Sequence, residues 1–209
     1  MPNILYEPVE KYLGDLLPRR DAVIAEMEEF AKRYHVPIVG PAVARLLALI
    51  TEIAGANRIF EMGSAIGYST IWLARAAGPR AKVYYTDGDP ENARRAEGYF
   101  RRAGVTRRIR VLVGDALELL RREKGPFDII FCDVEKRQYP ESLRIALPRL
   151  KRGGLLIADN TLWSGRVARQ ADTKDTQAIQ EFNKMVYASR ELYPVIVPFR
   201  DGASICRKR

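Results

Sequence analysis

Two short apolar runs in this sequence end in oxygen-bearing side chains. The run 155–158 is followed by Asp159 and Asn160, and the run 127–132 is followed by Asp133. Aspartate and asparagine are common turn and helix-cap residues, so Asp159-Asn160 alone is open to a purely structural interpretation. The alternative is a set of oxygen ligands for a hard divalent cation such as Mg²⁺, Mn²⁺ or Ca²⁺.

A second group of residues has the spacing of a nucleoside site. Gly63 and Gly67 follow the apolar run 58–62 in the pattern G-x-x-x-G, which differs from the dinucleotide fingerprint G-x-G-x-x-G. Asp87 lies 20 residues beyond Gly67. In nucleotide-binding α/β folds, a carboxylate at about this distance accepts hydrogen bonds from the ribose hydroxyls. Asp115 follows the next run and either meets an adenine amine or caps the following helix. Because the loop lacks the glycines that cradle a pyrophosphate, the set favours S-adenosylmethionine over a nicotinamide dinucleotide.

Alternating apolar runs and amphipathic segments predict the framework that positions these residues. Strands are expected at 58–62, 82–86, 109–113, 127–132, 155–158, 195–199 and 204–207, with helices at 68–77, 90–103, 116–122 and 140–150. This alternation predicts an α/β fold with a Rossmann-like, seven-stranded, mostly parallel sheet that carries helices on both faces. The turn Asp201-Gly202 predicts an antiparallel C-terminal hairpin. The runs 127–132 and 155–158 are then neighbouring strands, and Asp133, Asp159 and Asn160 converge.

The first part of the chain is expected to contribute two helices, at 19–34 and 41–53, and a further helix is expected at 172–190. We expect the first two to form an N-terminal helical cap (residues 1–55) over the C-terminal edge of the sheet or a partner surface. Residues 56–209 would form the Rossmann-like core of a single domain, because the chain shows no linker or repeat. The apolar face Val23, Met27 and Phe30 exceeds what a lone N-terminal helix needs and predicts a homodimer.

Composition limits the partners and the compartment. The net charge is +9, but the 26 Arg and 9 Lys are scattered, often in pairs, which is more typical of a solvated surface than of a nucleic-acid site. Two cysteines and one histidine, His35, exclude a disulfide framework and a Cys- or His-rich metal site. The absence of a signal peptide and of a long apolar span predicts a cytoplasmic protein without membrane association.

Four longer stretches carry a resemblance that runs from about Leu5 to the C-terminus. FEMGSAIGYSTIWLA, DVEKRQY, GGLLIADNTLWSGRV and DGASI resemble the cation-dependent O-methyltransferases of the catechol and caffeoyl-CoA type. The resemblance implies that Asp133, Asp159 and Asn160 bind the cation, with Mg²⁺ as the first expectation. It implies a methyl-donor site formed by Val39, Glu61, Gly63, Ser64, Tyr68, Ser69, Asp87, Asp115, Ala116, Asp133 and Glu135.

Two positions depart from the family pattern, and one loop is expected to select the acceptor. Glu135 stands where relatives usually have Asp, and Gly88 replaces a residue that is usually apolar. The residues that choose the acceptor are expected in the N-terminal helices and in the loop 163–175, with Trp163 and Ser164 as acceptor contacts.

The resemblance implies an S-adenosylmethionine-dependent O-methyltransferase that acts on a hydroxyl of a small catechol-like or hydroxycinnamoyl acceptor. A phenolic hydroxyl has a pKa of about 10, and a divalent cation bound to vicinal oxygens favours its ionised form. Lys136 has the position of the family's proposed base, and it either accepts the proton or stabilises the oxyanion by its charge.

Two alternatives remain open at the level of the sequence. A tRNA methyltransferase that acts on a hydroxylated wobble uridine is favoured by the excess of arginine, and the lack of a concentrated basic block argues against it. A non-catalytic donor-binding protein is disfavoured by the complete set of Asp133, Lys136, Asp159 and Asn160.

Overall fold

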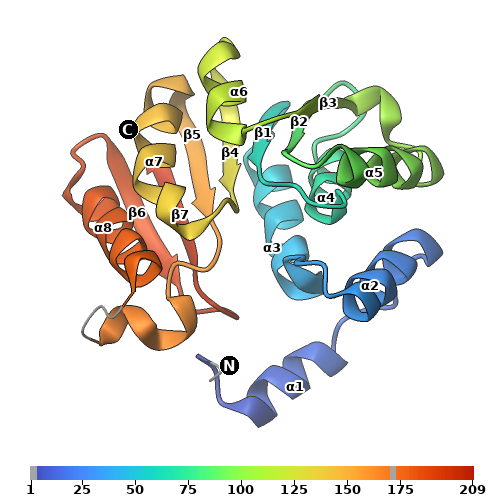
Figure 1. Ribbon diagram of the computed structural model, residues 1–209, viewed down its shortest axis with the longest axis horizontal. Helices are drawn as coiled ribbons and strands as arrows, with labels where there is room; N and C mark the ends of the chain where they lie inside the picture. Colours follow the sequence, from blue (N-terminus) through green and yellow to red (C-terminus); the bar gives the residue numbers. More distant parts are fainter. Residues whose placement is uncertain (1–3, 170–172) are drawn as a thin grey trace.

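One sheet organises the computed structural model, which describes residues 4–169 and 173–209 (Figure 1). Within these residues, seven strands lie in the order β3-β2-β1-β4-β5-β7-β6. Strands β1 to β5 pair in parallel, whereas β7 pairs antiparallel with both β5 and β6. The strands are β1 (Arg58–Met62), β2 (Lys82–Asp87), β3 (Ile109–Val113), β4 (Phe127–Cys132), β5 (Leu150–Ala158), β6 (Leu192–Val197) and β7 (Ala203–Lys208). The predicted Rossmann-like sheet and its C-terminal hairpin are confirmed.

Helices connect the strands and precede the sheet. They are α1 (Glu7–Asp15), α2 (Ala22–Tyr34), α3 (Gly40–Ile53), α4 (Tyr68–Ala76), α5 (Pro90–Arg102), α6 (Ala116–Arg122), α7 (Tyr139–Arg149) and α8 (Lys174–Ala188). Three short 3₁₀ segments are η1 (Thr106–Arg108), η2 (Lys136–Gln138) and η3 (Trp163–Ala168). Side-chain caps begin several helices: Asp21 accepts from two amides of α2, Asp89 from one of α5 and Asp115 from one of α6. The helix predicted from residue 172 begins within the described residues at Lys174.

The core lies on both faces of the sheet because successive strand residues point to opposite sides. On β1, Ile59 packs in a cluster with buried side chains of α2, α3, α4 and α5, whereas Phe60 packs in a second cluster with α6, α7 and α8. Complete burial of such a side chain contributes about 1.5–3 kcal/mol, so both layers hold the strands in place. A sheet covered on both faces agrees with the near-continuous apolar runs of its sequence.

The N-terminal part differs from its prediction in two ways. A third helix, α1, precedes the two expected ones; it was missed although Val9, Tyr12, Leu13 and Leu16 have helical spacing, and none of its residues is buried. The apolar face of α2 packs within the chain: Met27 is fully buried in the first core cluster, and Val23 and Phe30 lie against that cluster. This face therefore does not support the homodimer that was inferred from it.

Strand β5 begins at Leu150, five residues earlier than predicted. The register with β4 shifts between the pairs Phe127–Leu150 and Ile129–Leu155, and two glycines lie in this irregular stretch. A Cβ at Gly154 would lie 2.9 Å from the carbonyl oxygen of Lys151, so a larger residue does not fit. The polar residues of this bend hid the start of the strand. Among the described residues, no helix is long and apolar enough to span a membrane.

Candidate active site

The ends of three adjacent strands bring the predicted site residues together. Cys132 pairs with Ala158 in the ladder between β4 and β5, so Asp133 and Asp159, which come next, lie side by side. Gly63, at the end of β1, approaches from the other side, and a Cβ there would collide with the carbonyl oxygen of Asp133. Glycine permits both this close approach and the positive φ of 80° that the loop adopts. The strand order reverses between β1 and β4, where sheets of this class bind their ligands.

Asn160 turns the chain away from the sheet. Its φ of 56° lies in the left-handed region, which asparagine tolerates better than most residues. The turn is fixed by two backbone hydrogen bonds, from the amide of Trp163 to the carbonyl of Asn160 at 3.2 Å and from the amide of Thr161 to the carbonyl of Gly202 at 2.9 Å. The amide side chain of Asn160 consequently lies beside the carboxylates rather than in solvent.

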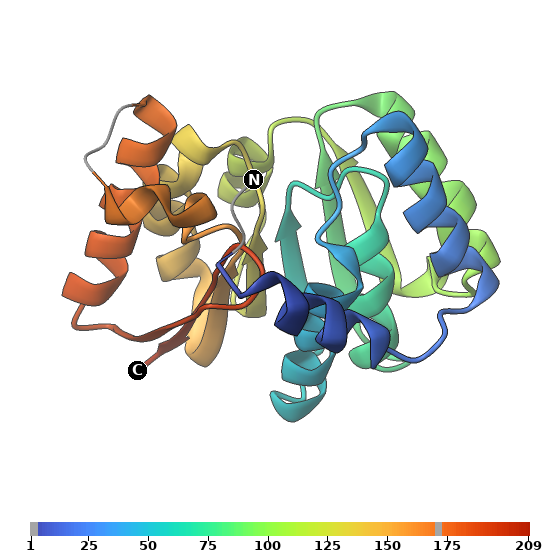
Figure 2. The same ribbon diagram turned by 90° about the horizontal axis from the view of Figure 1, so that it is seen from below.

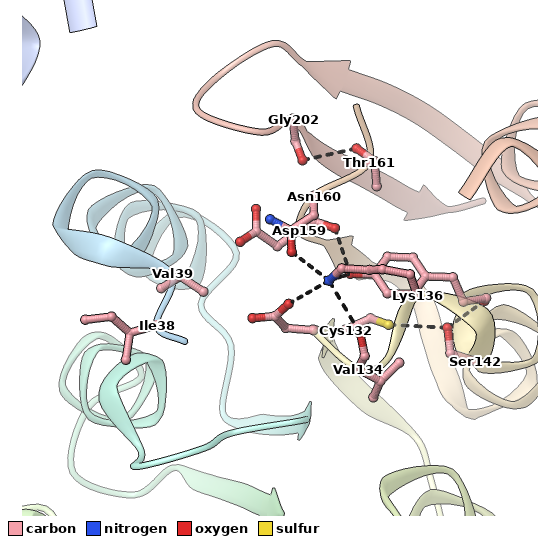
Figure 3. A network of polar contacts seen from close by, with 12 residues as sticks. Ile38, Val39, Cys132, Val134, Lys136, Ser142, Asp159, Asn160, Thr161 and Gly202 are labelled. Atoms are coloured by element: carbon pink, nitrogen blue, oxygen red, sulfur yellow. Dashed lines mark hydrogen bonds and ion pairs between the residues drawn. The ribbon is translucent and has the colours of Figure 1, made fainter. Parts of the chain in front are cut away.

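Lys136 connects the ends of β4 and β5 (Figure 3). Its Nζ donates to Oδ1 of Asn160 at 2.7 Å, to Oη of Tyr139 at 3.1 Å and to Oδ1 of Asp133 at 3.3 Å. Oη of Tyr139 in turn donates to the backbone carbonyl of Asp159 at 2.8 Å. An ammonium group has three donors and no acceptor, and these contacts use that capacity. The lysine therefore supplies positive charge at the point where the two carboxylates meet.

Asp159 is only 2% exposed, and its Oδ1 has no hydrogen-bond partner among the described residues. Burial raises the pKa of Asp159 to about 7, and the charge of Asp133 adds to the rise. Burial also raises the pKa of Asp133, whereas Lys136 opposes that rise. A buried carboxylate oxygen without a partner costs free energy unless a ligand completes its contacts.

The donor set fits a hard divalent cation. Asp133, Asp159 and Asn160 offer two carboxylates and one neutral amide oxygen, and oxygen atoms are the ligands that Mg²⁺, Mn²⁺ and Ca²⁺ prefer. Within residues 4–169 and 173–209, no cluster of three His, Cys, Asp or Glu side chains suits a metal ion. An ion bound here would therefore have few protein ligands and room for water and acceptor oxygens, which is the usual coordination of Mg²⁺.

A cavity of about 750 Å³ lies over these strand ends. Its size is within the range of small-molecule sites. Of the predicted residues, it is lined by Val39, Gly63, Ser64, Tyr68, Ser69, Asp87, Asp115, Ala116, Asp133, Glu135, Lys136, Asp159, Asn160 and Trp163. Glu61 and Ser164 are not among the lining residues. The backbone amide of Ser164 instead donates to Asp201.

Asp87 holds the glycine loop in this structure. Its Oδ2 accepts from the amide of Ala65 at 2.9 Å, and its Oδ1 accepts from the amide of Asp89 at 2.9 Å and from Nδ2 of Asn92 at 3.1 Å. A carboxylate has about four lone-pair positions, so Asp87 retains capacity for a further donor such as a ribose hydroxyl.

Glu61 lies beneath the glycine loop and does not line the cavity, but it contacts Ser64, which does. Its side chain is fully buried, and Oε2 accepts from Oγ of Ser64 at 2.9 Å and from Oγ1 of Thr70. Oε1 has no partner among the described residues. Burial raises the pKa of Glu61 to about 7, and the surrounding hydroxyl groups oppose the rise. The resemblance placed Glu61 at the donor, whereas in the structure it supports the loop from behind.

Glu61→Gln is expected to raise the free energy of unfolding at pH 8 and to change it little at pH 4. The pKa is about 7 in the folded protein and ordinarily near 4.5, so between these values the native state binds more protons than the unfolded state. Stability therefore falls as pH rises through this window, and glutamine removes that part of the fall. The full shift corresponds to about 3 kcal/mol, and weakened hydrogen bonds reduce the expected gain to about 1–2 kcal/mol.

Urea unfolding of both proteins at pH 4, 6 and 8 measures this effect. Glu97→Gln, on the exposed face of α5, is the matched control and should leave the pH profile unchanged. Parallel profiles for the wild type and Glu61→Gln would show that Glu61 does not carry the buried charge.

Four further residues contribute to the cavity or its support and were not expected from the sequence. Ala65 presents its amide to Asp87, and Asn92 anchors the same carboxylate. Nε2 of Gln138 donates to Oδ2 of Asp115 at 3.3 Å. Arg200 lines the cavity from the loop between β6 and β7. Each of these residues contacts the cavity or its support from a different element of the fold. Such contacts between elements cannot be predicted from the neighbouring residues in the sequence.

The glycine loop, the carboxylates at the ends of β2 and β3, and the oxygen set at β4 and β5 define the class of S-adenosylmethionine-dependent methyltransferases with a Rossmann-like fold. The family model described as O-methyltransferase matches residues 19–209. The chain therefore belongs to the O-methyltransferase family and is an S-adenosylmethionine-dependent O-methyltransferase.

Known relatives support this assignment. A catechol O-methyltransferase from Niastella koreensis is 34% identical over 196 residues, which cover 90% of this chain and 89% of that protein. The structure of an O-methyltransferase from Bacillus cereus in complex with SAH superimposes with a TM-score of 0.88 at 28% identity and covers 97% of both chains. The O-methyltransferase TomG from Streptomyces achromogenes, in complex with SAM, gives a TM-score of 0.87 at 26% identity and covers 98% of this chain and 99% of its own.

Proposed function

We propose that this enzyme requires a divalent cation and transfers a methyl group to a hydroxyl of a small catechol-like or hydroxycinnamoyl acceptor. The observation that carries the proposal is the buried Oδ1 of Asp159, which has no hydrogen-bond partner among the described residues and lies beside Asp133 and Asn160 in the cavity. Mg²⁺ fits this set of oxygen atoms best, because it accepts few protein ligands and retains positions for others.

A cation bound at these oxygens would hold two vicinal acceptor oxygens and favour ionisation of the hydroxyl that is methylated. The protein contributes the rest of the arrangement. Asp133, Asp159 and Asn160 fix the place of the acceptor oxygens next to the glycine loop. Lys136 directs its ammonium to the same place and stabilises negative charge there; alternatively, it first gives up a proton and then, as the neutral amine, accepts the proton of the acceptor hydroxyl. Trp163, in the cavity wall, offers an aromatic surface to the acceptor ring.

The donor half of the cavity is proposed to bind S-adenosylmethionine. The backbone of Gly63, Ser64 and Ala65 lies next to Asp133, so the methionine part of the donor would lie near the acceptor oxygens. Asp87 would accept from the ribose hydroxyls, and Asp115 and Ala116 would contact the adenine. Val39, Tyr68, Ser69 and Glu135 complete the cavity wall.

Asp87→Ala is expected to weaken S-adenosylmethionine binding by about 10- to 100-fold. This loss corresponds to about one charged hydrogen bond to ribose, worth about 1.5–3 kcal/mol. Calorimetric titration of both proteins measures it. Asp21→Ala, which removes a helix cap remote from the cavity, is the control and should bind as the wild type does. Equal S-adenosylmethionine affinities for Asp87→Ala and the wild type would show that Asp87 only stabilises the turn and does not bind the donor.

A methyl-transfer screen tests the acceptor. Purified enzyme is incubated with S-adenosylmethionine and, separately, catechols, hydroxycinnamoyl thioesters and undermodified tRNA, with Mg²⁺ or with a chelator. We expect methylation of a dihydroxyphenyl acceptor that is lost in chelator and restored by Mg²⁺ or Mn²⁺. Methylation of tRNA alone, with salt-dependent binding, would support the wobble-uridine alternative instead.

We also propose a homodimer, now on the basis of α1 rather than α2. No residue of α1 is buried, and Tyr12 and Leu16, four residues apart on one helix face, are each 62% exposed. Tyr6, Val9 and Leu13 extend the exposed apolar surface. Figure 2 shows α1, in dark blue, on the outside of the molecule. Apolar surface of this kind is stabilised by burial against a second copy of the chain.

The double substitution Tyr12→Glu and Leu16→Glu is expected to convert the dimer into a monomer, because two charges per copy would be buried in the interface. Sedimentation velocity at micromolar concentration measures the state of the wild type and the variant. Lys11→Ala, on the same helix, is the control and should remain dimeric. A monomeric wild type at this concentration would contradict the proposal.

A further inference from the structure

Arg200 lies where three separate segments meet at the acceptor side of the cavity. The loop that carries it is fixed to the segment after Asn160: the amide of Leu162 donates to the carbonyl of Asp201 at 3.0 Å, and the amide of Ser164 donates to the Asp201 carboxylate. Arg200 therefore has a defined position relative to Asn160 and Trp163, even though the loop is at the surface.

The guanidinium group reaches from this loop to the N-terminal cap. Nη1 and Nη2 donate to the carbonyl oxygen of Ile38 at 3.3 and 3.4 Å, and Nη1 also donates to the carbonyl oxygen of Val39. Both residues line the cavity, and Figure 3 shows them across from Asp159 and Asn160. The residue itself has a φ of 53°, a left-handed conformation that is strained for a non-glycine residue. The side chain is therefore held by these hydrogen bonds while the backbone of Arg200 adopts a strained conformation.

The charge of Arg200 is only partly compensated. Its hydrogen bonds are to neutral carbonyl groups, and no described carboxylate lies within 4 Å of the guanidinium. Arg200 lines the same cavity as Asp133 and Asp159, so its positive charge lies on the acceptor side of the cavity. Among the described residues, the basic side chains that line the cavity are Lys136 and Arg200. Lys136 is paired with Asp133, whereas Arg200 has no described carboxylate partner.

We propose that Arg200 determines acceptor specificity by binding a carboxylate on the acceptor ring. This inference rests on the proposed function, because it assumes that the acceptor's vicinal hydroxyls lie at Asp133, Asp159 and Asn160. The guanidinium group offers the geometry that carboxylates prefer, and its two hydrogen-bonded carbonyl partners keep it oriented. The acceptor is then a dihydroxyphenyl carboxylic acid, with its ring against the apolar wall formed by Val36, Ile38 and Trp163.

Matched acceptors test the inference. The values of kcat/KM are measured for 3,4-dihydroxybenzoate and for the neutral 3,4-dihydroxybenzamide, with the wild type, Arg200→Gln and Arg200→Lys. Comparing the acid-to-amide ratio between proteins removes the intrinsic reactivity of each acceptor. Arg200→Gly is a further variant whose backbone accepts the positive φ without strain, so loss of the charge is tested even if Arg200→Gln folds poorly. Arg190→Gln, an exposed arginine at the end of α8, is the control.

We expect Arg200→Gln and Arg200→Gly to lower the acid-to-amide ratio by about tenfold, mainly through a higher KM for the acid, as loss of a charged hydrogen bond predicts. Arg200→Lys should keep most of the preference, and Arg190→Gln all of it. An equal loss for both acceptors would overturn the inference and leave Arg200 as a structural link between the loop and the cap. An unchanged ratio would also overturn it. Failure of the wild type to methylate either compound would also overturn the inference, whereas the proposed function is decided separately by the acceptor screen.

Discussion

Asp159→Ala is expected to reduce methyl transfer by more than about 10²-fold while S-adenosylmethionine binds with nearly unchanged affinity. Substitution of a residue that only orients a metal ligand lowers metal affinity or activity by about 10- to 100-fold, so substitution of a ligand itself should lower activity further. The buried Oδ1 of Asp159 has no partner among the described residues, so its proposed role is to bind the ion. Asp133→Ala should behave in the same way.

Three measurements check this expectation: turnover of a dihydroxyphenyl acceptor, calorimetric binding of the donor and calorimetric binding of Mn²⁺. Asn160→Ala is the graded comparison and should lose less activity, because water replaces a neutral ligand at a smaller electrostatic cost. Normal donor binding by Asp159→Ala would exclude misfolding as the cause of lost turnover. Full activity of Asp159→Ala in the presence of a chelator would contradict the cation site and support the structural interpretation of Asp159-Asn160 as a polar turn after a buried strand.

Lys136→Ala is expected to lower kcat by about 10²–10⁴-fold, the usual contribution of a positioned general acid–base group. Its Nζ lies 2.7 Å from Asn160 and 3.3 Å from Asp133, so it would be next to an acceptor hydroxyl held at those residues. Turnover by the variant should recover in part at high pH, where the acceptor hydroxyl ionises without help. The pH profile of kcat for both proteins measures this.

Lys136→Arg separates the two roles of the lysine. Arginine keeps the positive charge and does not release its proton. Lys136→Arg should therefore retain part of the activity if the lysine stabilises negative charge, and none of its contribution if the lysine is a general base. Donor affinity should be the same in both variants, because Lys136 contacts the acceptor side of the site. A wild-type rate for Lys136→Ala at neutral pH would leave this lysine as a link between the ends of β4 and β5.

Much of the fold followed from the sequence because it depends on local periodicity. The strands β1, β3 and β4 and the helix α6 have the predicted bounds, since each is a short apolar run or an amphipathic segment between clear breaks. The convergence of Asp133 with Asp159 was also predictable. Parallel strands place their carboxyl ends at one edge of the sheet, so two acids that follow neighbouring strands must meet there.

Other features required the tertiary structure. The polar bend at Gly153-Gly154 hid the first half of β5. The spacing of Val9, Tyr12, Leu13 and Leu16 is helical, but only the structure shows that α1 contributes no buried residue. The face of α2 that resembled an interface proved to be core, since amphipathicity alone does not say what covers a helix.

The sequence by itself determined the class of this protein and the chemical types at its site: a glycine loop, acids at successive strand ends, an amide and a lysine. The tertiary structure alone decided which of them face the cavity. It placed Glu61 behind the glycine loop, left Oδ1 of Asp159 without a partner in the part of the chain that the structure describes, and brought Arg200 to Val39, 161 residues away in the chain. The physical reason is that strand and helix patterns depend on neighbours within a few residues, whereas burial, charge balance and side-chain contacts depend on segments that meet only after folding.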